Sequence, residues 1–148
     1  MTRRRVGAKS THASQVGRPG ASGGYIWEMS ERALSEHVRR TFASLPGVLA
    51  YHTHDSRRSA SGFPDWIVLV GDRAWALELK SAIGRTTPDQ GRWLAALGRL
   101  PRWTARVVRP EDWPAVRDEI VTAALRGMDP NFTGGLSSEA YVRTLRDE

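Results

Sequence analysis

The segment from residue 65 to residue 80 most constrains the fold, because it has the pattern of a β-hairpin. Residues 65–70 (DWIVLV) and 73–80 (RAWALELK) are two runs rich in β-branched, aromatic and other apolar residues, as is typical of strands. Gly71 and Asp72 separate the runs, and a glycine-containing pair at this place predicts a two-residue turn. The chain is therefore expected to form an antiparallel ribbon here.

The length of the turn also determines which residues face each other. A two-residue turn pairs Val70 with Arg73. The same register places Asp65 directly opposite Glu78, and because side chains alternate along a strand, Lys80 shares the face of Glu78. Two carboxylates in such a pair have Cβ atoms only about 5 Å apart and repel each other. A divalent cation between them would remove that repulsion.

This arrangement has the chemistry of a metal-dependent centre that cleaves phosphodiesters. Mg²⁺ takes oxygen ligands and keeps several waters, so two carboxylates and a main-chain carbonyl are enough to hold it. The cation would polarise a phosphodiester oxygen and generate or orient the attacking hydroxide, while Lys80 could stabilise charge on the phosphate. Lys80 is the only lysine after Lys9, and an ammonium is a compact charge with a tunable pKa. The alternative is that Glu78 and Lys80 lie on a solvated face of the ribbon.

A helix start follows at residues 87–90 (TPDQ). Thr87 fits the N-cap, Pro88 fits the first helical position, and Gln90 is placed to close a capping box. Gln90 also shares a helix face with three apolar residues, Trp93, Leu94 and Leu97. That face is expected to lie against the sheet, so Gln90 could cap the helix and also reach the metal water or the phosphate.

An earlier helix is predicted from Ser30 to about Ser44. Its apolar stripe comprises Leu34, Val38, Phe42 and Leu45. Glu31 falls on the side of that stripe and Glu36 nearly opposite, because each residue turns about 100° around an α-helix. Glu31 is therefore the candidate for an inward-facing acid. The alternative is that it only complements the helix dipole in the first turn.

Polar residues crowd the segment immediately before Asp65. Arg57 or Arg58 could clamp a DNA phosphate, and His52 could lie at the rim of the site. The alternative is a solvated loop with ordinary surface charges. A zinc site is not favoured, because the chain has no cysteine and the pair His52 and His54 lacks a matching second pair.

The rest of the pattern completes an α/β domain. Residues 103–108 (WTARVV) predict a further strand, and residues 115–125 predict a helix. The residues expected to pack that helix on the sheet are Trp113, Val116 and Ile120. The order helix, strand, hairpin, helix, strand, helix predicts one domain, at residues 25–126, with a central mixed β-sheet flanked by α-helices. Residues 127–148 are expected to form a loop and a short terminal helix.

Residues 1–24 are expected to be a disordered basic tail. They contain three arginines in a row, one further arginine and one lysine, with no acid, and so carry five of the six net positive charges. Such a tail could hold nucleic acid through phosphate contacts, whereas the alternative is a solubilising leader or an upstream start-site artefact. Because the sequence shows no cysteine, secretory signal or long apolar segment, a cytoplasmic protein without membrane contact is expected.

Three motifs together resemble the VRR-Nuc family of the PD-(D/E)XK nuclease superfamily, which is common in bacteriophage genomes. They are residues 52–65 (HTHDSRRSASGFPD), 78–80 (ELK) and 87–90 (TPDQ). The similarity covers about residues 30–120. It implies a restriction-endonuclease-like core and a Mg²⁺- or Mn²⁺-dependent DNA endonuclease, which would act in the bacterial host cell if the chain is encoded by a phage.

The same resemblance implies roles for individual residues. The implied metal ligands are Asp65, Glu78, the Leu79 carbonyl and, from the first helix, Glu31. The implied catalytic residues are Lys80 and Gln90, together with Asp65 and Glu78. The resemblance also favours DNA contacts by Ser56 and Arg57, and it implies branched substrates such as Holliday junctions, cleaved by a homodimer.

Two other functions stay open at this point. One is a non-catalytic nucleic-acid-binding module that keeps the nuclease fold, and the other is a metal-dependent RNase. The acid pair argues against the first, since a binding module has no need for it. Matched RNA and DNA substrates would separate the second from a DNA endonuclease.

Overall fold

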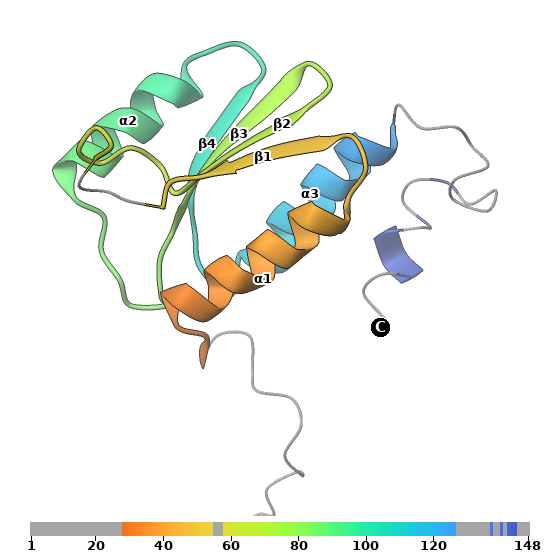
Figure 1. Cartoon of the computed structure of the whole chain (residues 1–148), viewed down its shortest axis with the longest axis horizontal. Coiled ribbons are helices and arrows are strands. Elements are labelled where there is room, and N and C mark those ends of the chain that lie inside the picture. The colour runs from red at the N-terminus through yellow and green to blue at the C-terminus, as the bar shows by residue number, and fades with distance from the viewer. Residues whose placement is uncertain (1–27, 55–57, 127–136, 138–139, 141, 145–148) are drawn as a thin grey trace, which may run out of the picture.

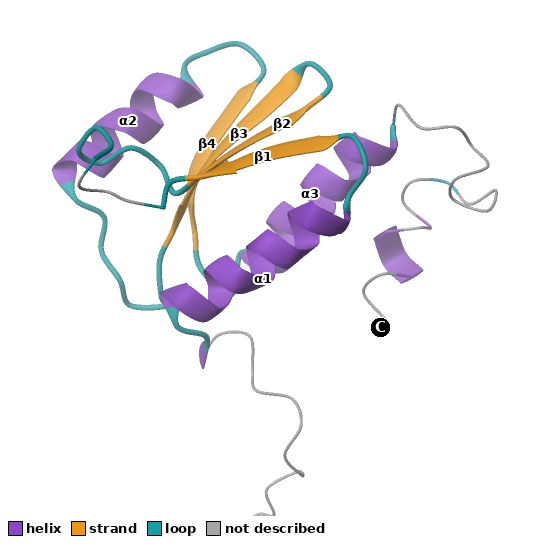
Figure 2. Cartoon of the chain, in the orientation of Figure 1, coloured by secondary structure: helices purple, strands orange, loops and turns teal. Residues whose placement is uncertain are grey.

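A computed structural model describes residues 28–54, 58–126, 137, 140 and 142–144. The predicted basic tail at 1–24 lies outside these residues, as does most of the predicted C-terminal loop and helix. Figures 1 and 2 show the arrangement of the described elements. In chain order they are α1 (Glu31–Ser44), β1 (Val48–His52), β2 (Trp66–Val70), β3 (Arg73–Leu79), α2 (Pro88–Gly98), β4 (Trp103–Val108) and α3 (Trp113–Leu125).

The four strands form one mixed sheet in the order β1-β2-β3-β4. The pairs β1–β2 and β2–β3 are antiparallel, and β4 runs parallel to β3 after the α2 crossover. Val70 pairs with Arg73 across the turn, so the predicted hairpin register is confirmed. Gly71 has a φ of 56°, a left-handed conformation that glycine adopts without strain from a Cβ atom. The sheet therefore has the register that the predicted pairing of Asp65 with Glu78 requires.

Helices cover both faces of the sheet, which confirms the expected α/β class. In Figure 1, α1 and α3 lie together on one face and α2 lies on the other. The main core fills the layer under α1 and α3. Its largest members are Leu34, Phe42, Trp66, Trp75, Leu77, Leu79, Trp113 and Ile120. Because side chains alternate along a strand, every second residue of the strands points toward α2, and Glu78 is one of these. The Glu78 side chain is thereby separated from the core under α1 and α3.

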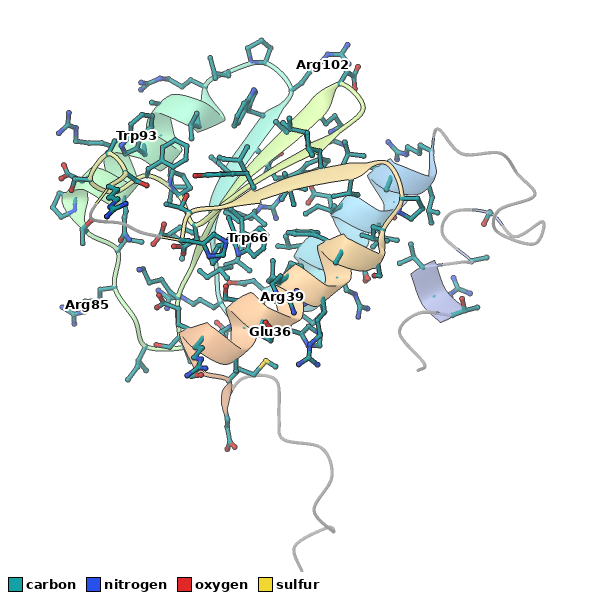
Figure 3. All side chains as sticks on the ribbon, viewed as in Figure 1. Glu36, Arg39, Trp66, Arg85, Trp93 and Arg102 are labelled. Atoms are coloured by element: carbon teal, nitrogen blue, oxygen red, sulfur yellow. The ribbon has the colours of Figure 1, made fainter. Side chains whose placement is uncertain are left out.

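Aromatic rings join α1 to the sheet and to α3. Phe42 meets the ring of Trp66 edge-on at 5.6 Å between centroids, and it meets Trp113 in the same way at 5.8 Å. Figure 3 shows Trp66 between the sheet and α1. The N-cap Ser30 accepts a hydrogen bond from the Ala33 N–H at 3.2 Å, which starts α1 just before Glu31. The ring contacts thus anchor the second half of α1 to the sheet and to α3, and the Ser30 cap fixes where the helix begins.

The predicted boundaries hold for most elements. The strand at 103–108 and the helix start at Thr87 are as expected. The last helix was expected from residue 115 but begins at Trp113, because Pro114 takes one of the first two helical positions and Asp112 becomes the cap residue. Within the described residues, none of the helices combines the length and apolarity that a membrane crossing would need.

We predict that Phe42→Ala destabilises the fold by about 3–5 kcal/mol, because it removes a buried ring and leaves a cavity between two tryptophans. Leu49→Ala is the matched control, since Leu49 is 69% exposed on β1 and its truncation should change stability by only about 0.5 kcal/mol. Urea unfolding of both variants measures the difference. Equal losses would contradict this account of the core.

Candidate functional site

Asp65 lies immediately before β2 and is held across the hairpin to β3. Its Oδ2 accepts a hydrogen bond from the Leu79 N–H at 2.8 Å. The observed pairing ends at Trp66 and Leu77, and one further step of the same register places Asp65 opposite Glu78, whose pKa the charge of Asp65 raises. Glu78 is buried, with 1% of its surface exposed. The structure therefore brings the two acids together at the end of the sheet.

The Leu79 carbonyl faces the same edge as Asp65. In a strand the N–H and C=O of one residue point toward the same neighbouring strand, and the Leu79 N–H points toward Asp65. Two pairs beyond Trp66 and Leu77, the residue opposite Leu79 is Pro64, which has no N–H to donate. The Pro64 carbonyl instead accepts a hydrogen bond from Thr53 Oγ1 at 2.9 Å. Proline at this position leaves the Leu79 oxygen without the donor that a regular ladder would supply.

Glu78 has one partnered and one unpartnered oxygen. Oε1 accepts hydrogen bonds from Lys80 Nζ, at 2.9 Å, and from Gln90 Nε2. Oε2 is buried and has no hydrogen-bond partner among the described residues. Burial, together with the nearby charges of Asp65 and Glu31, raises the pKa of Glu78 from 4.5 to about 7, although Lys80 acts in the opposite direction. The site thus contains a carboxylate whose charge is incompletely stabilised by the protein.

Lys80 keeps its positive charge beside this acid. Partial burial lowers the pKa of the Lys80 ammonium, but the hydrogen bond and charge of Glu78 raise it more, and the net shift is upward. Glu31 and Asp65 add to the upward shift. The side chain is only 12% exposed. The prediction that Lys80 lies on the face of Glu78 is confirmed by their contact.

Gln90 makes the predicted capping contact and also contacts Glu78, which the sequence did not predict. Its Oε1 accepts a hydrogen bond from the Thr87 N–H at 2.8 Å, and the Gln90 N–H donates to Thr87 Oγ1 at 3.2 Å, which completes the capping box. Its Nε2 donates to Glu78 Oε1. One side chain therefore caps α2 and contacts the buried acid, because its oxygen and its nitrogen point in different directions.

A pocket of about 360 Å³ opens beside this cluster. Its lining residues are Glu31, Arg32, Ser35, His52, Asp65 and Leu79. Four of them were predicted as site residues, and they come from α1, β1, the start of β2 and the end of β3. However, no three His, Asp or Glu side chains of the described residues are grouped so that they could hold a metal ion together. Glu31 lies in the pocket and acts on Glu78 through its charge, but it does not complete a three-ligand set with the two strand acids.

His52 lines the pocket mainly as a packed ring. It stacks on Trp66 with centroids 4.4 Å apart, and its Nε2 lies 3.5 Å from Ser35 Oγ. Burial and then the charge of His54 lower the pKa of His52, although Asp65 acts the other way. The contact of His52 with DNA stays a prediction.

The basic segment before the acid pair is described only in part. Ser56 and Arg57 lie outside the described residues, so their predicted DNA contacts have no structural counterpart here. Arg58 is described and exposed. Its position agrees with contact with a phosphate but does not distinguish this role from an ordinary surface charge.

The residues present fit a hard divalent cation held mainly by oxygen. The oxygens that would hold such a cation are those of Asp65, the unpartnered Oε2 of Glu78 and the Leu79 carbonyl. Two carboxylates and a carbonyl suit a cation that keeps several of its own waters, as Mg²⁺ does. A cation would also supply the charge that the buried Glu78 lacks.

Sequence reasoning missed the residue that braces the loop after Lys80. Arg109 donates from Nη1 to the Ser81 carbonyl at 2.6 Å and to the Ala82 carbonyl at 3.3 Å. Its own N–H donates to Asp112 Oδ2 at 2.9 Å. No local pattern marks this arginine, because its partners lie 27 and 28 residues earlier in the chain.

Comparisons of the chain with protein-family models, with curated proteins and with solved structures found no match.

We predict that Glu78→Gln makes the metal-free protein more stable at pH 8. The pKa of Glu78 is raised on folding, so wild-type stability is lost as pH rises toward and through about 7, and the neutral amide escapes this loss. Thermal unfolding in a chelator should show a higher Tm for the variant at pH 8 and similar values at pH 4.5. Mn²⁺ should then stabilise the wild type and not the variant. A variant that is less stable at pH 8 would contradict this account of Glu78.

Proposed function

We propose that the protein is a metal-dependent DNA endonuclease of the VRR-Nuc type, with a restriction-endonuclease-like core. One observation carries the proposal. A buried glutamate faces an aspartate across a strand pair, contacts a lysine and a glutamine through one oxygen, and leaves its other oxygen unpartnered. An ion pair that only stabilised the fold would not require the second acid, Asp65, or a buried oxygen without a hydrogen-bond donor.

The cation would be Mg²⁺ or Mn²⁺, held by Asp65, Glu78 and the Leu79 carbonyl. When bound, it supplies Lewis-acid polarisation of a phosphodiester oxygen and lowers the pKa of a water. Asp65 is positioned for its role by its bond from the Leu79 N–H, which fixes the carboxylate against β3. Asp65 therefore stands at the entry to β2 and Glu78 on the neighbouring strand β3, which limits their freedom to move apart.

Lys80 and Gln90 supply donors on the other side of Glu78. The Lys80 ammonium remains protonated beside the acid and can stabilise negative charge that builds up on the phosphate. The Gln90 amide is held by the capping box, so its Nε2 keeps a fixed direction toward the site. Neither group is proposed to transfer a proton to the substrate. Lys80 would stabilise negative charge on the phosphate, and Gln90 would supply a fixed hydrogen-bond donor.

Binding of nucleic acid would use arginines around the site. Arg32 lines the pocket, and Arg58 and Arg85 are exposed in the segments that precede Asp65 and follow Lys80 in the chain. Residues 1–24 add five positive charges that can contact phosphates without sequence preference. Branched DNA such as a Holliday junction, action as a homodimer and a bacterial host are proposed from the resemblance alone, whereas a cytoplasmic location is proposed from the composition.

We predict Mg²⁺- or Mn²⁺-dependent cleavage by the wild type in a panel of linear, flapped and four-way DNA. Asp65→Asn keeps an oxygen for the Leu79 N–H but removes the charge, and Lys80→Met keeps the stem but removes the ammonium. Both should lower the cleavage rate by at least about 100-fold, because charge stabilisation contributes at that level. Folding is checked by circular dichroism.

The same panel separates the alternatives. A binding module on a nuclease fold would bind DNA equally well as wild type or Asp65→Asn and would never cut. Cleavage of matched RNA but not DNA would identify an RNase. Either result would contradict the proposed DNA endonuclease.

We predict that Glu31→Gln lowers metal-dependent cleavage by about 10-fold, because groups outside the direct ligands but close to them tune metal sites at that level. Glu36→Gln is the matched control on the same helix. Glu36 pairs with Arg39 on the outer surface of α1, as Figure 3 shows. Its loss should leave the cleavage rate unchanged. Equal effects of the two substitutions would show that Glu31 acts only as a helix-start acid.

A further inference from the structure

The turn before Asp65 is docked against the first turns of α2. Ser61 Oγ donates a hydrogen bond to Asp89 Oδ2 at 2.8 Å, and Trp93 Nε1 donates to the Ser61 carbonyl at 3.1 Å. The Phe63 ring packs edge-on against Trp93, with centroids 5.0 Å apart. Figure 3 shows Trp93 on α2 beside this turn. Two segments that are about 30 residues apart in sequence are thus joined by three independent contacts.

Gly62 allows this contact to be close. A Cβ atom at Gly62 would lie 2.4 Å from the Asp89 carbonyl carbon and 2.5 Å from the Gln90 nitrogen. Both of these atoms belong to the main chain of α2, so no side-chain rotation can relieve the clash. Gly62 also has a φ of 78°. The backbone of the turn therefore rests directly on the backbone of the helix.

The helix needs such contacts because it is weakly packed. None of the residues of α2 is fully buried, whereas α1 and α3 each insert several side chains into the core. Hydrophobic packing therefore does less to fix α2 than to fix the other two helices. Yet α2 carries Gln90, whose Nε2 must reach Glu78.

We propose that the docked turn is a positioning device for the proposed nuclease site, with Gly62, Ser61, Asp89 and Trp93 as positioning residues. The inference rests on the proposed function. On one side the turn leads through Pro64 into Asp65, and on the other it presses on the helix residue next to Gln90. One contact thereby sets the place of the aspartate and of the amide relative to Glu78.

The decisive comparison is between Gly62→Ala and Gly71→Ala. Both glycines have positive φ, at 78° and 56°, so alanine strains the backbone at either position. A Cβ at Gly71 meets nothing within 4 Å, whereas at Gly62 it strikes α2. Gly71→Ala therefore reproduces the backbone strain without displacing the helix.

Two readouts are used on the full chain. The first is the side-chain amide signal of Gln90 in a ¹H–¹⁵N NMR spectrum without metal, which reports the contact with Glu78. The second is the split between kcat and KM for DNA cleavage with Mn²⁺. In Gly62→Ala the amide signal should move toward that of a free glutamine, and kcat should fall by about tenfold or more with little change in KM. Gly71→Ala should leave the signal in place and keep kcat within about twofold.

A second set of variants keeps the test valid if Gly62→Ala fails to fold. Ser61→Ala and Asp89→Ala should each lower kcat, and the double variant should lose no more than either single one, because both remove one bond. Asp89→Asn, which keeps an accepting oxygen, should restore kcat. Arg92→Gln removes the other partner of Asp89, on the exposed side, and should have no effect.

The outcomes distinguish this inference from the proposed function. If the wild type cuts no nucleic acid but the Gln90 signal responds to Gly62→Ala and not to Gly71→Ala, the positioning contact stands and the nuclease proposal fails. If the wild type cuts and the two alanine variants behave alike in both readouts, the positioning inference is overturned. Additive losses in the Ser61 and Asp89 variants would overturn it as well.

Discussion

The register of β2 against β3 is the constraint on which the rest of the site depends. The large side chains packed on the core face hold this register along both strands, and a shift of one residue would turn Glu78 into the core layer under α1 and α3. In the observed register, alternate residues divide cleanly. Tryptophans and leucines fill the core face, while the acid pair and Lys80 take the opposite face. The sheet can therefore be rigid on one side and chemically active on the other.

The burial of Glu78 is costly unless its charge is compensated. Moving a carboxylate out of water costs several kcal/mol even after the protein relaxes. Lys80 and Gln90 compensate one oxygen, and the other is left buried without a donor in the described part of the chain. The pKa of Glu78 is raised to about 7 because this compensation is incomplete. In the proposed function, a bound cation would complete this compensation.

Local chemistry made much of this structure predictable. The hairpin, the capping box at Thr87 and the contact of Lys80 with Glu78 each follow from neighbouring residues and fixed geometry. Contacts between distant segments were not predictable. Nothing near Arg109 indicates its bonds to the loop after Lys80, and the helical spacing of Glu31 gave its face but not its failure to join a three-ligand set. The predicted start of α3 was two residues late, because Asp112 and Pro114, a cap residue and an early helical proline, were assigned to the preceding loop.

The carboxylates of Asp65 and Glu78 are held in place by one kind of interaction, and the side-chain amide of Gln90 by another. Asp65 and Glu78 stand on adjacent strands whose other face is packed with large side chains, so the core that stabilises the fold also fixes the distance between them. Gln90 stands on a helix with no fully buried residue, and it depends on hydrogen bonds, one ring contact and a glycine that admits the backbone of the preceding turn. Substitutions in the core should therefore act on folding and on the acid pair together. Substitutions at the docked turn can move the amide while the sheet stays intact, because that contact contributes little to the core.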